Sequence, residues 1–129
     1  MPQRHNNRAT ILVVEDEAFV RSAIVRILQS LGFTSVVDVA SGAEALQAIA
    51  GAPGGFSIAV FDITLSDMRI EKLAEQLPAT HGIETLVLCS GGTADDFRSA
   101  QAAFEQLGVP TIHCRKKPVG IADFKTALL

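Results

Sequence analysis

The amino-acid sequence predicts an α/β fold in which helices cover both faces of a parallel sheet of five strands. Two observations carry this prediction. Short runs of apolar, often β-branched residues alternate with longer segments whose apolar residues recur at helical spacing. The short runs contain few polar residues, as is typical of strands that are buried on both faces of a sheet. The length of 129 residues suits one domain with one core.

Five apolar runs are predicted as strands. The third run ends at Asp62 and follows a turn at 51–55 that contains three glycines and a proline. The fifth run is expected to be short. The predicted strands are 10–14, 36–39, 57–61, 85–89 and 110–114.

The segments between these runs are predicted as helices, and several carry end signals. Ser41 with Glu44, and Thr93 with Asp96, match patterns in which side chains satisfy the first amides of a helix. Gly32 is a typical residue just beyond a helix C-terminus. The predicted helices are 18–31, 41–49, 71–77, 93–107 and a last one near Ile121.

Composition excludes several classes of protein. A net charge of −3 argues against direct binding of nucleic acid, and the sequence shows neither a signal peptide nor an apolar run that would span a bilayer. Cys89 and Cys114 lie in apolar runs and are interpreted as reduced core residues of a cytoplasmic protein. Residues 1–9 are expected to form a flexible tail, and residues 10–129 the domain.

Acidic residues follow two of the predicted strands. Glu15 and Asp16 come after the first strand and Asp62 after the third. Ligand sites of such sheets lie outside the carboxyl ends of the strands, so the three carboxylates are expected to converge. Two such charges about 4 Å apart repel by roughly 4 kcal/mol at an effective dielectric constant of about 20. Oxygen ligands around an open site indicate Mg²⁺ as the counter-ion.

Two further groups complete the predicted site. Ser90 follows the fourth strand and Lys117 follows the fifth. An ammonium group and a hydroxyl donor, next to a metal, are the groups that stabilise a transferring phosphoryl group. The pattern therefore indicates phosphoryl transfer.

Four segments resemble the receiver domain of bacterial two-component response regulators. They are ILVVEDE at 11–17, VFDITLSDM at 60–68, LVLCSG at 86–91 and the pair Lys117-Pro118. The resemblance implies a flavodoxin-like sandwich with strand order 2-1-3-4-5.

The resemblance also implies a role for each site residue. Asp62 corresponds to the phosphoacceptor, and Glu15 and Asp16 to the acidic pair that binds Mg²⁺ together with Asp62 and the backbone carbonyl of Thr64. Ser90 corresponds to the switch hydroxyl and Lys117 to the lysine of the site.

The implied partners are proteins. A histidine kinase or a histidine phosphotransfer protein would donate the phosphoryl group, and a downstream effector or a fused output domain would respond. A monomer or weak homodimer is expected, without contact to nucleic acid or membrane. The domain would catalyse only its own phosphorylation and dephosphorylation, and would not otherwise be an enzyme. The predicted helix 93–107 and strand 110–114 are the expected partner surface.

The sequence departs from this family at several positions. The loop after the acceptor usually contains a proline and a glycine, where this chain has Ser66 and Ile70. Cys114 stands where the family usually has an aromatic residue. Ser90 and Lys117 are 27 positions apart, which is longer than usual. These features weakly resemble receivers that precede cyclic-di-GMP phosphodiesterase domains, so both a stand-alone receiver and the first part of a longer regulator fit.

Three other functions fit the pattern less well. A haloacid-dehalogenase-type phosphatase would need a second aspartate at position 64, where this chain has Thr64. A nucleotide-binding module would need a glycine-rich turn after its first strand, where this chain has acids. A degenerate receiver that only binds proteins would keep the fold without phosphorylation.

Overall fold

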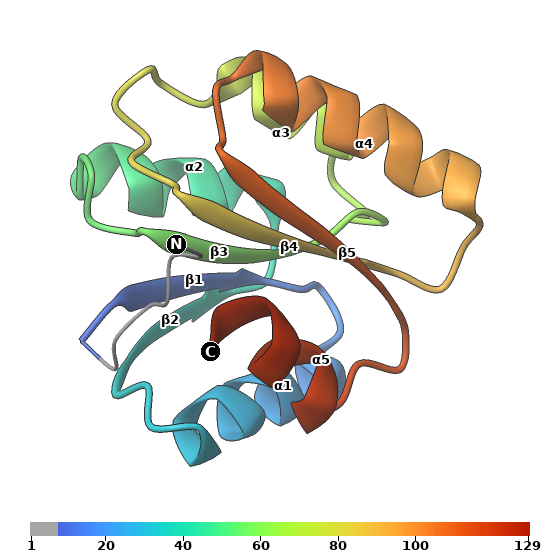
Figure 1. The fold of residues 1–129 in the computed structure, drawn as a ribbon. Coiled ribbons are helices and arrows are strands. Elements are labelled where there is room, and N and C mark those ends of the chain that lie inside the picture. The colour runs from blue at the N-terminus through green and yellow to red at the C-terminus, as the bar shows by residue number, and fades with distance from the viewer. Residues whose placement is uncertain (1–7) are drawn as a thin grey trace.

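The computed structural model describes residues 8–129 and shows a three-layer α/β sandwich (Figure 1). Its five strands are all parallel and lie in the order β2-β1-β3-β4-β5, which confirms the predicted fold class and strand order. The flexible tail predicted for residues 1–9 falls almost entirely outside the described residues. Within 8–129, no helix combines the length and the apolar character that crossing a bilayer requires.

The strands form where the apolar runs predicted them. Their bounds are β1 Thr10–Val14, β2 Ser35–Val39, β3 Ile58–Asp62, β4 Thr85–Ser90 and β5 Thr111–Lys116. The prediction of a short fifth strand is wrong, because β5 has six residues, as many as β4. Arg115 and Lys116 pair with Cys89 and Ser90 and so belong to the sheet. The apolar pattern ends before the strand does, because an edge strand tolerates charged side chains such as these.

The helices confirm the predicted segments within a few residues at their ends. Their bounds are α1 Ala18–Ser30, α2 Gly42–Gly51, α3 Ile70–Gln76, α4 Ala94–Gln106 and α5 Ile121–Leu128. The oxygen of the Ser41 side chain accepts the N–H of Glu44 at 3.1 Å and caps α2, as its sequence pattern predicted. A carboxylate oxygen of Asp96 accepts the N–H of Thr93 at 2.7 Å at the start of α4.

Two apolar cores lie on opposite faces of the sheet. Side chains alternate along each strand, so Leu12 and Val14 point to one core while Ile11 and Val13 point to the other. Helices α2, α3 and α4 cover the first core, and α1 and α5 cover the second (Figure 1). Because the strands are parallel, their carboxyl ends lie together, so the residues at the ends of β1, β3, β4 and β5 meet at one end of the sheet.

Candidate functional site

Three carboxylates gather at the carboxyl ends of β1 and β3. One oxygen from each of Glu15, Asp16 and Asp62 lies within 4.8 Å of the others. Glu15 is only 1% exposed and Asp62 only 3% exposed, whereas Asp16 is half-buried at the rim. Like charges held this close in low-dielectric surroundings need a positive partner.

Lys117 supplies a positive charge to this cluster. Its Nζ donates to Glu15 Oε1 at 2.6 Å and to Asp62 Oδ2 at 3.0 Å. The backbone N–H of Lys117 donates to the carbonyl of Ser90 at 2.9 Å, which fixes the end of β5 beside β4. The lysine is thereby held over both buried carboxylates.

The two buried carboxylates differ in acidity. Burial raises the pKa of Glu15 above its ordinary 4.5, and the hydrogen bond from Lys117 offsets only part of this rise. Burial acts on Asp62 too, but hydrogen bonds from the amide and hydroxyl of Thr64 and from Lys117 outweigh it, so its pKa lies below the ordinary 3.8. Burial lowers the pKa of Lys117, but the two carboxylates raise it further, to above its ordinary 10.5. Asp62 is therefore an anion and Lys117 a cation at neutral pH.

Thr64 orients the carboxylate of Asp62. Its backbone N–H and its hydroxyl donate to Asp62 Oδ1 at 2.9 and 2.7 Å. One oxygen of Asp62 is thus held by Thr64 and the other by Lys117. The resemblance to receivers assigned the backbone carbonyl of Thr64 as a metal ligand, and that assignment stays a prediction.

Ser90 ends β4 beside the acidic cluster and is fully buried. Its Oγ accepts the N–H of Gly92 at 2.9 Å, which orients the hydroxyl from the loop that leads into α4. Asp62 pairs with Cys89 of the adjacent strand β4. Ser90 therefore lies one residue beyond the level of Asp62, at the same end of the sheet. The fold therefore brings Glu15, Asp16, Asp62, Ser90 and Lys117 to one end of the sheet, as predicted.

The ligand atoms at this end of the sheet suit a hard divalent cation. Each of the three clustered side chains offers a carboxylate oxygen, and oxygen ligands are what Mg²⁺ prefers. Glu15, Asp16 and Asp62 are the residues that would hold it. The structure thus shows an acidic group that could hold the predicted cation, and the assignment of these residues as Mg²⁺ ligands stays a prediction.

Arg21 stabilises the loop that carries the acidic pair, a role that no sequence pattern indicated. Its Nη1 donates to the carbonyl of Glu15 at 2.9 Å, and its Nε donates to Asp38 Oδ2 at 3.1 Å. In the sequence Arg21 was simply a polar position in an amphipathic helix. Only the packing of α1 beside the end of β2 brings these groups together.

Asp67 is a second residue that the sequence did not single out. Its carboxylate accepts the backbone N–H groups of Gly42 and Ala43 at 3.0 Å each. These hydrogen bonds hold the pKa of Asp67 below its ordinary 3.8. No local signal could reveal them, because the partners are about 25 positions away in the sequence.

The position of the usual aromatic residue is filled by a thiol. Cys114 packs half-buried against the core that α4 covers, and its Sγ lies 3.6 Å from Gln101 Oε1. The neighbouring His113 pairs with Val87, whose side chain belongs to the opposite core, so His113 faces away from Cys114 as expected. Cys89 is buried, as predicted, and Cys114 only partly so.

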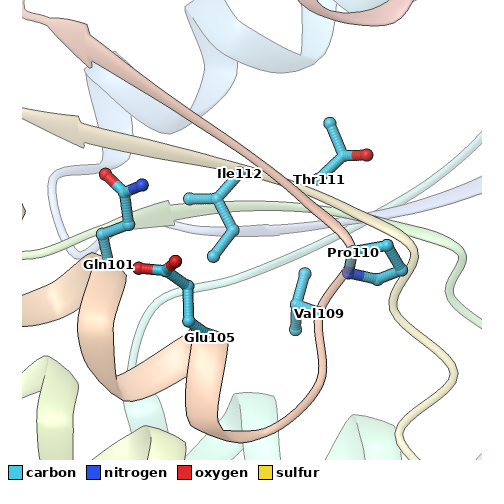
Figure 2. Close-up of a pocket in the computed structure, with 6 residues that line it drawn as sticks. All are labelled: Gln101, Glu105, Val109, Pro110, Thr111 and Ile112. Carbon is cyan, nitrogen blue, oxygen red and sulfur yellow. The ribbon is translucent and has the colours of Figure 1, made fainter. Parts of the chain in front are cut away.

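A hollow of about 440 Å³ lies between α4 and the start of β5 (Figure 2). Because parallel strands share one direction, the start of β5 lies at the opposite end of the sheet from Asp62. The hollow is therefore separate from the acidic cluster. It is lined by Gln101, Glu105, Val109, Pro110, Thr111 and Ile112.

Comparisons with known proteins match this fold. CheY4 of Vibrio cholerae, a chemotaxis response regulator, has the same fold with a TM-score of 0.74 at 19% identity, covering 94% of this chain and 96% of that chain. A response regulator receiver protein from Sinorhizobium medicae WSM419 gives a TM-score of 0.71 at 27% identity, covering 94% and 91%.

A curated protein sequence also resembles this chain. The sensor kinase CckA of Brucella abortus is 40% identical over 89 residues. The match covers 69% of this chain but 9% of the kinase, so this chain spans a small part of that relative. Residues 11–127 match the family described as the response regulator receiver domain. The chain therefore belongs to the response regulator receiver domain family of two-component systems.

Proposed function

We propose that Asp62 accepts a phosphoryl group in a Mg²⁺-dependent reaction and that this switches a protein-interaction surface. The observation that carries the proposal is the contact of Lys117 with both Asp62 and Glu15 inside the acidic cluster. A carboxylate that is anionic, buried and held from two sides is suited to attack phosphorus. The fixed cation beside it is suited to receive the charge of the phosphoryl oxygens.

The proposed reaction follows from the positions of these groups. An oxygen of Asp62 forms a bond to phosphorus while the bond from phosphorus to a donor histidine nitrogen breaks. The imidazole keeps the electron pair of the broken bond. Lys117 then interacts with a phosphoryl oxygen instead of with the bare carboxylate. Bound Mg²⁺ would supply further charge neutralisation, through Glu15, Asp16, Asp62 and the carbonyl of Thr64.

Ser90 supplies the proposed response to phosphorylation. Its Oγ already accepts the N–H of Gly92, so the hydroxyl hydrogen remains available to donate to a phosphoryl oxygen. Movement of Ser90 toward that oxygen would pull the loop that leads into α4. The face formed by α4 and β5, with its hollow (Figure 2), is then the output surface for an effector or a fused output domain.

The proposed donor is a histidine kinase or a histidine phosphotransfer protein. An apolar hollow of about 370 Å³ adjoins Lys117 and is lined by Phe19 and Ile24 among other residues. Phe19 is 84% exposed, which is unusual for a large apolar side chain and favours a protein partner here. We include a cytoplasmic location in the proposal, in keeping with the free thiols of Cys89 and Cys114. In this scheme the catalytic groups act on the domain itself and not on an external substrate.

Incubation with acetyl phosphate and Mg²⁺ tests the proposal. The wild-type protein should gain one phosphoryl group by intact-mass analysis and should form a beryllofluoride adduct. Asp62→Ala should lose both. Asp95→Ala is the matched control, because Asp95 is an exposed acid whose ion pair is with Arg98, and it should behave like the wild type.

Two results would contradict the proposal. If the wild-type protein neither binds Mg²⁺ nor forms the adduct, the domain is a degenerate receiver that only binds proteins. If it instead hydrolyses added phosphomonoesters, with loss of activity in Asp62→Ala, it is an aspartyl-phosphate hydrolase.

A further inference from the structure

The loop after Asp62 is fixed at its far end by the first turn of α2. Oδ1 of Asp67 accepts the N–H of Gly42, and Oδ2 accepts the N–H of Ala43, each at 3.0 Å. The first amides of a helix have no partner within it, and the helix dipole favours a negative charge there. Asp67 therefore makes a two-pronged contact between elements that are distant in sequence.

A second contact fixes the same pair of segments. A Cβ at Gly42 would lie 2.7 Å from both Cγ and Sδ of Met68. Met68 therefore packs directly onto the backbone of α2, at a position where any added Cβ would force the thioether to shift. Its neighbour Asp67 holds the amides of the same turn, so two consecutive side chains fasten the loop to α2.

The near end of this loop reaches the acidic cluster. The backbone N–H of Ser66 donates to Asp16 Oδ2 at 3.1 Å. Residues 66, 67 and 68 thus connect the carboxylate of Asp16 to the start of α2. Asp16 is the half-buried member of the cluster, and the Ser66 amide orients one of its carboxylate oxygens.

The contact of Asp67 is separate from the capping of α2 by its own residues. Ser41 accepts the N–H of Glu44 at 3.1 Å, and Glu44 in turn accepts the N–H of Ala40 at 3.2 Å. The helix thus has a local cap. Asp67 adds hydrogen bonds to different amides, from a loop that belongs to the site.

We infer that Asp67 is a positioning residue for the metal site and acts through Ser66 on Asp16. This inference rests on the proposed function, because it assigns Asp67 to the Mg²⁺ site named there. In this chain, the contact supplies rigidity that the loop lacks with Ser66 in place of proline. Without it, Asp16 and the Ser66 amide would have to be ordered each time the cation binds.

The test is the affinity for Mg²⁺ alone, measured by calorimetry or by amide NMR shifts. Asp67→Ala should weaken binding by about tenfold, in the range seen when residues that orient a metal ligand are removed. Asp67→Asn keeps one acceptor oxygen but turns an NH₂ group toward the other amide, so its affinity should be intermediate. The Ser66 amide should exchange with solvent faster in Asp67→Ala than in the wild type.

Ser41→Ala is the matched control. It also removes one hydrogen bond to the first turn of α2, but it leaves the loop after Asp62 in place. It should lower thermal stability and leave Mg²⁺ affinity unchanged. A purely structural role for Asp67 would give the same pattern for Asp67→Ala, and that result would overturn the inference.

The variants also separate this inference from the proposed function. If the wild-type protein does not bind Mg²⁺, both the proposed function and the inference fall. If the wild-type protein and Asp67→Asn bind Mg²⁺ equally well while both are folded in thermal melts, the inference alone is overturned.

Discussion

At the scale of single residues, Glu15 and Asp62 show how neighbouring carboxylates acquire different properties. Both are buried and both contact Lys117, yet Asp62 also receives two hydrogen bonds from Thr64. Asp62 is consequently the better-stabilised anion and Glu15 the poorer one. The sequence predicted which residues meet here, because each follows a strand. It could not predict Arg21 or Asp67, whose partners depend on how separate elements pack.

Glu15→Gln should stabilise the protein in the absence of Mg²⁺. The folded-state pKa of Glu15 is raised, so its contribution to stability is present below 4.5 and is lost as the pH rises through the folded-state value. At pH 7 the folded wild-type protein carries the cost of burying an ionised carboxylate at Glu15, and the folded variant does not. We expect a gain of about 0.5–2 kcal/mol in the free energy of unfolding, measured with urea in EDTA.

Saturating Mg²⁺ should make the wild-type protein more stable than Glu15→Gln. Saturating Mg²⁺ should raise the midpoint of unfolding more for the wild type, because Glu15 offers a charged ligand oxygen. A variant that is less stable in EDTA at pH 7, with an unchanged response to Mg²⁺, would show that the Lys117 contact outweighs the burial of Glu15.

At the scale of elements, the start of α4 depends on a glycine. A Cβ at Gly92 would lie 2.1 Å from Oδ2 of Asp96, the oxygen that accepts the N–H of Thr93. Gly92 also donates its own N–H to Ser90, so the glycine links the switch hydroxyl to the helix. The sequence predicted the pairing of Thr93 with Asp96, because capping patterns are local. It did not predict the requirement for glycine, which depends on the path of the loop.

Gly92→Ala should displace Asp96 and weaken the start of α4. The expected loss is about 1 kcal/mol of unfolding free energy, as for removal of a helix cap. Gly91→Ala is the matched control, because a Cβ there meets nothing within 4 Å, and it should change stability by less than about 0.5 kcal/mol. Urea unfolding compares the two variants. Equal effects would show that the close approach at Gly92 relaxes without cost.

At the scale of the whole molecule, the order of the strands and the two cores follow from the sequence. The alternation of apolar runs with amphipathic segments predicts helices on both faces, and the resemblance to receivers supplied the order of the strands. The extent of β5 was not predictable in the same way. It lies at an edge, where polar side chains such as Arg115 are tolerated and the apolar signal ends before the strand does.

Substitution of Phe104 tests whether the two cores, on opposite faces of the sheet, unfold together. Phe104 is fully buried, and its ring centroid lies 5.7 Å from that of Phe61. Phe104→Ala should cost about 3–5 kcal/mol in unfolding free energy, since it leaves a cavity in the core under α4. Phe19→Ala, at an exposed position, should cost less than about 0.5 kcal/mol.

Both cores share one sheet, so the whole domain should unfold in a single step. In Phe104→Ala, the backbone amides of α1 and α5 on the opposite face should lose as much protection against hydrogen exchange as those of α4. Separate midpoints for the two faces would contradict this expectation.

The contact between Met68 and Gly42 limits which substitutions these two positions tolerate during evolution. The thioether occupies the volume that any side chain at position 42 would need. Replacement of this glycine therefore requires the Met68 side chain to shift or residue 68 to become smaller. Related chains with a smaller residue 68 are where a replacement of the glycine should be found.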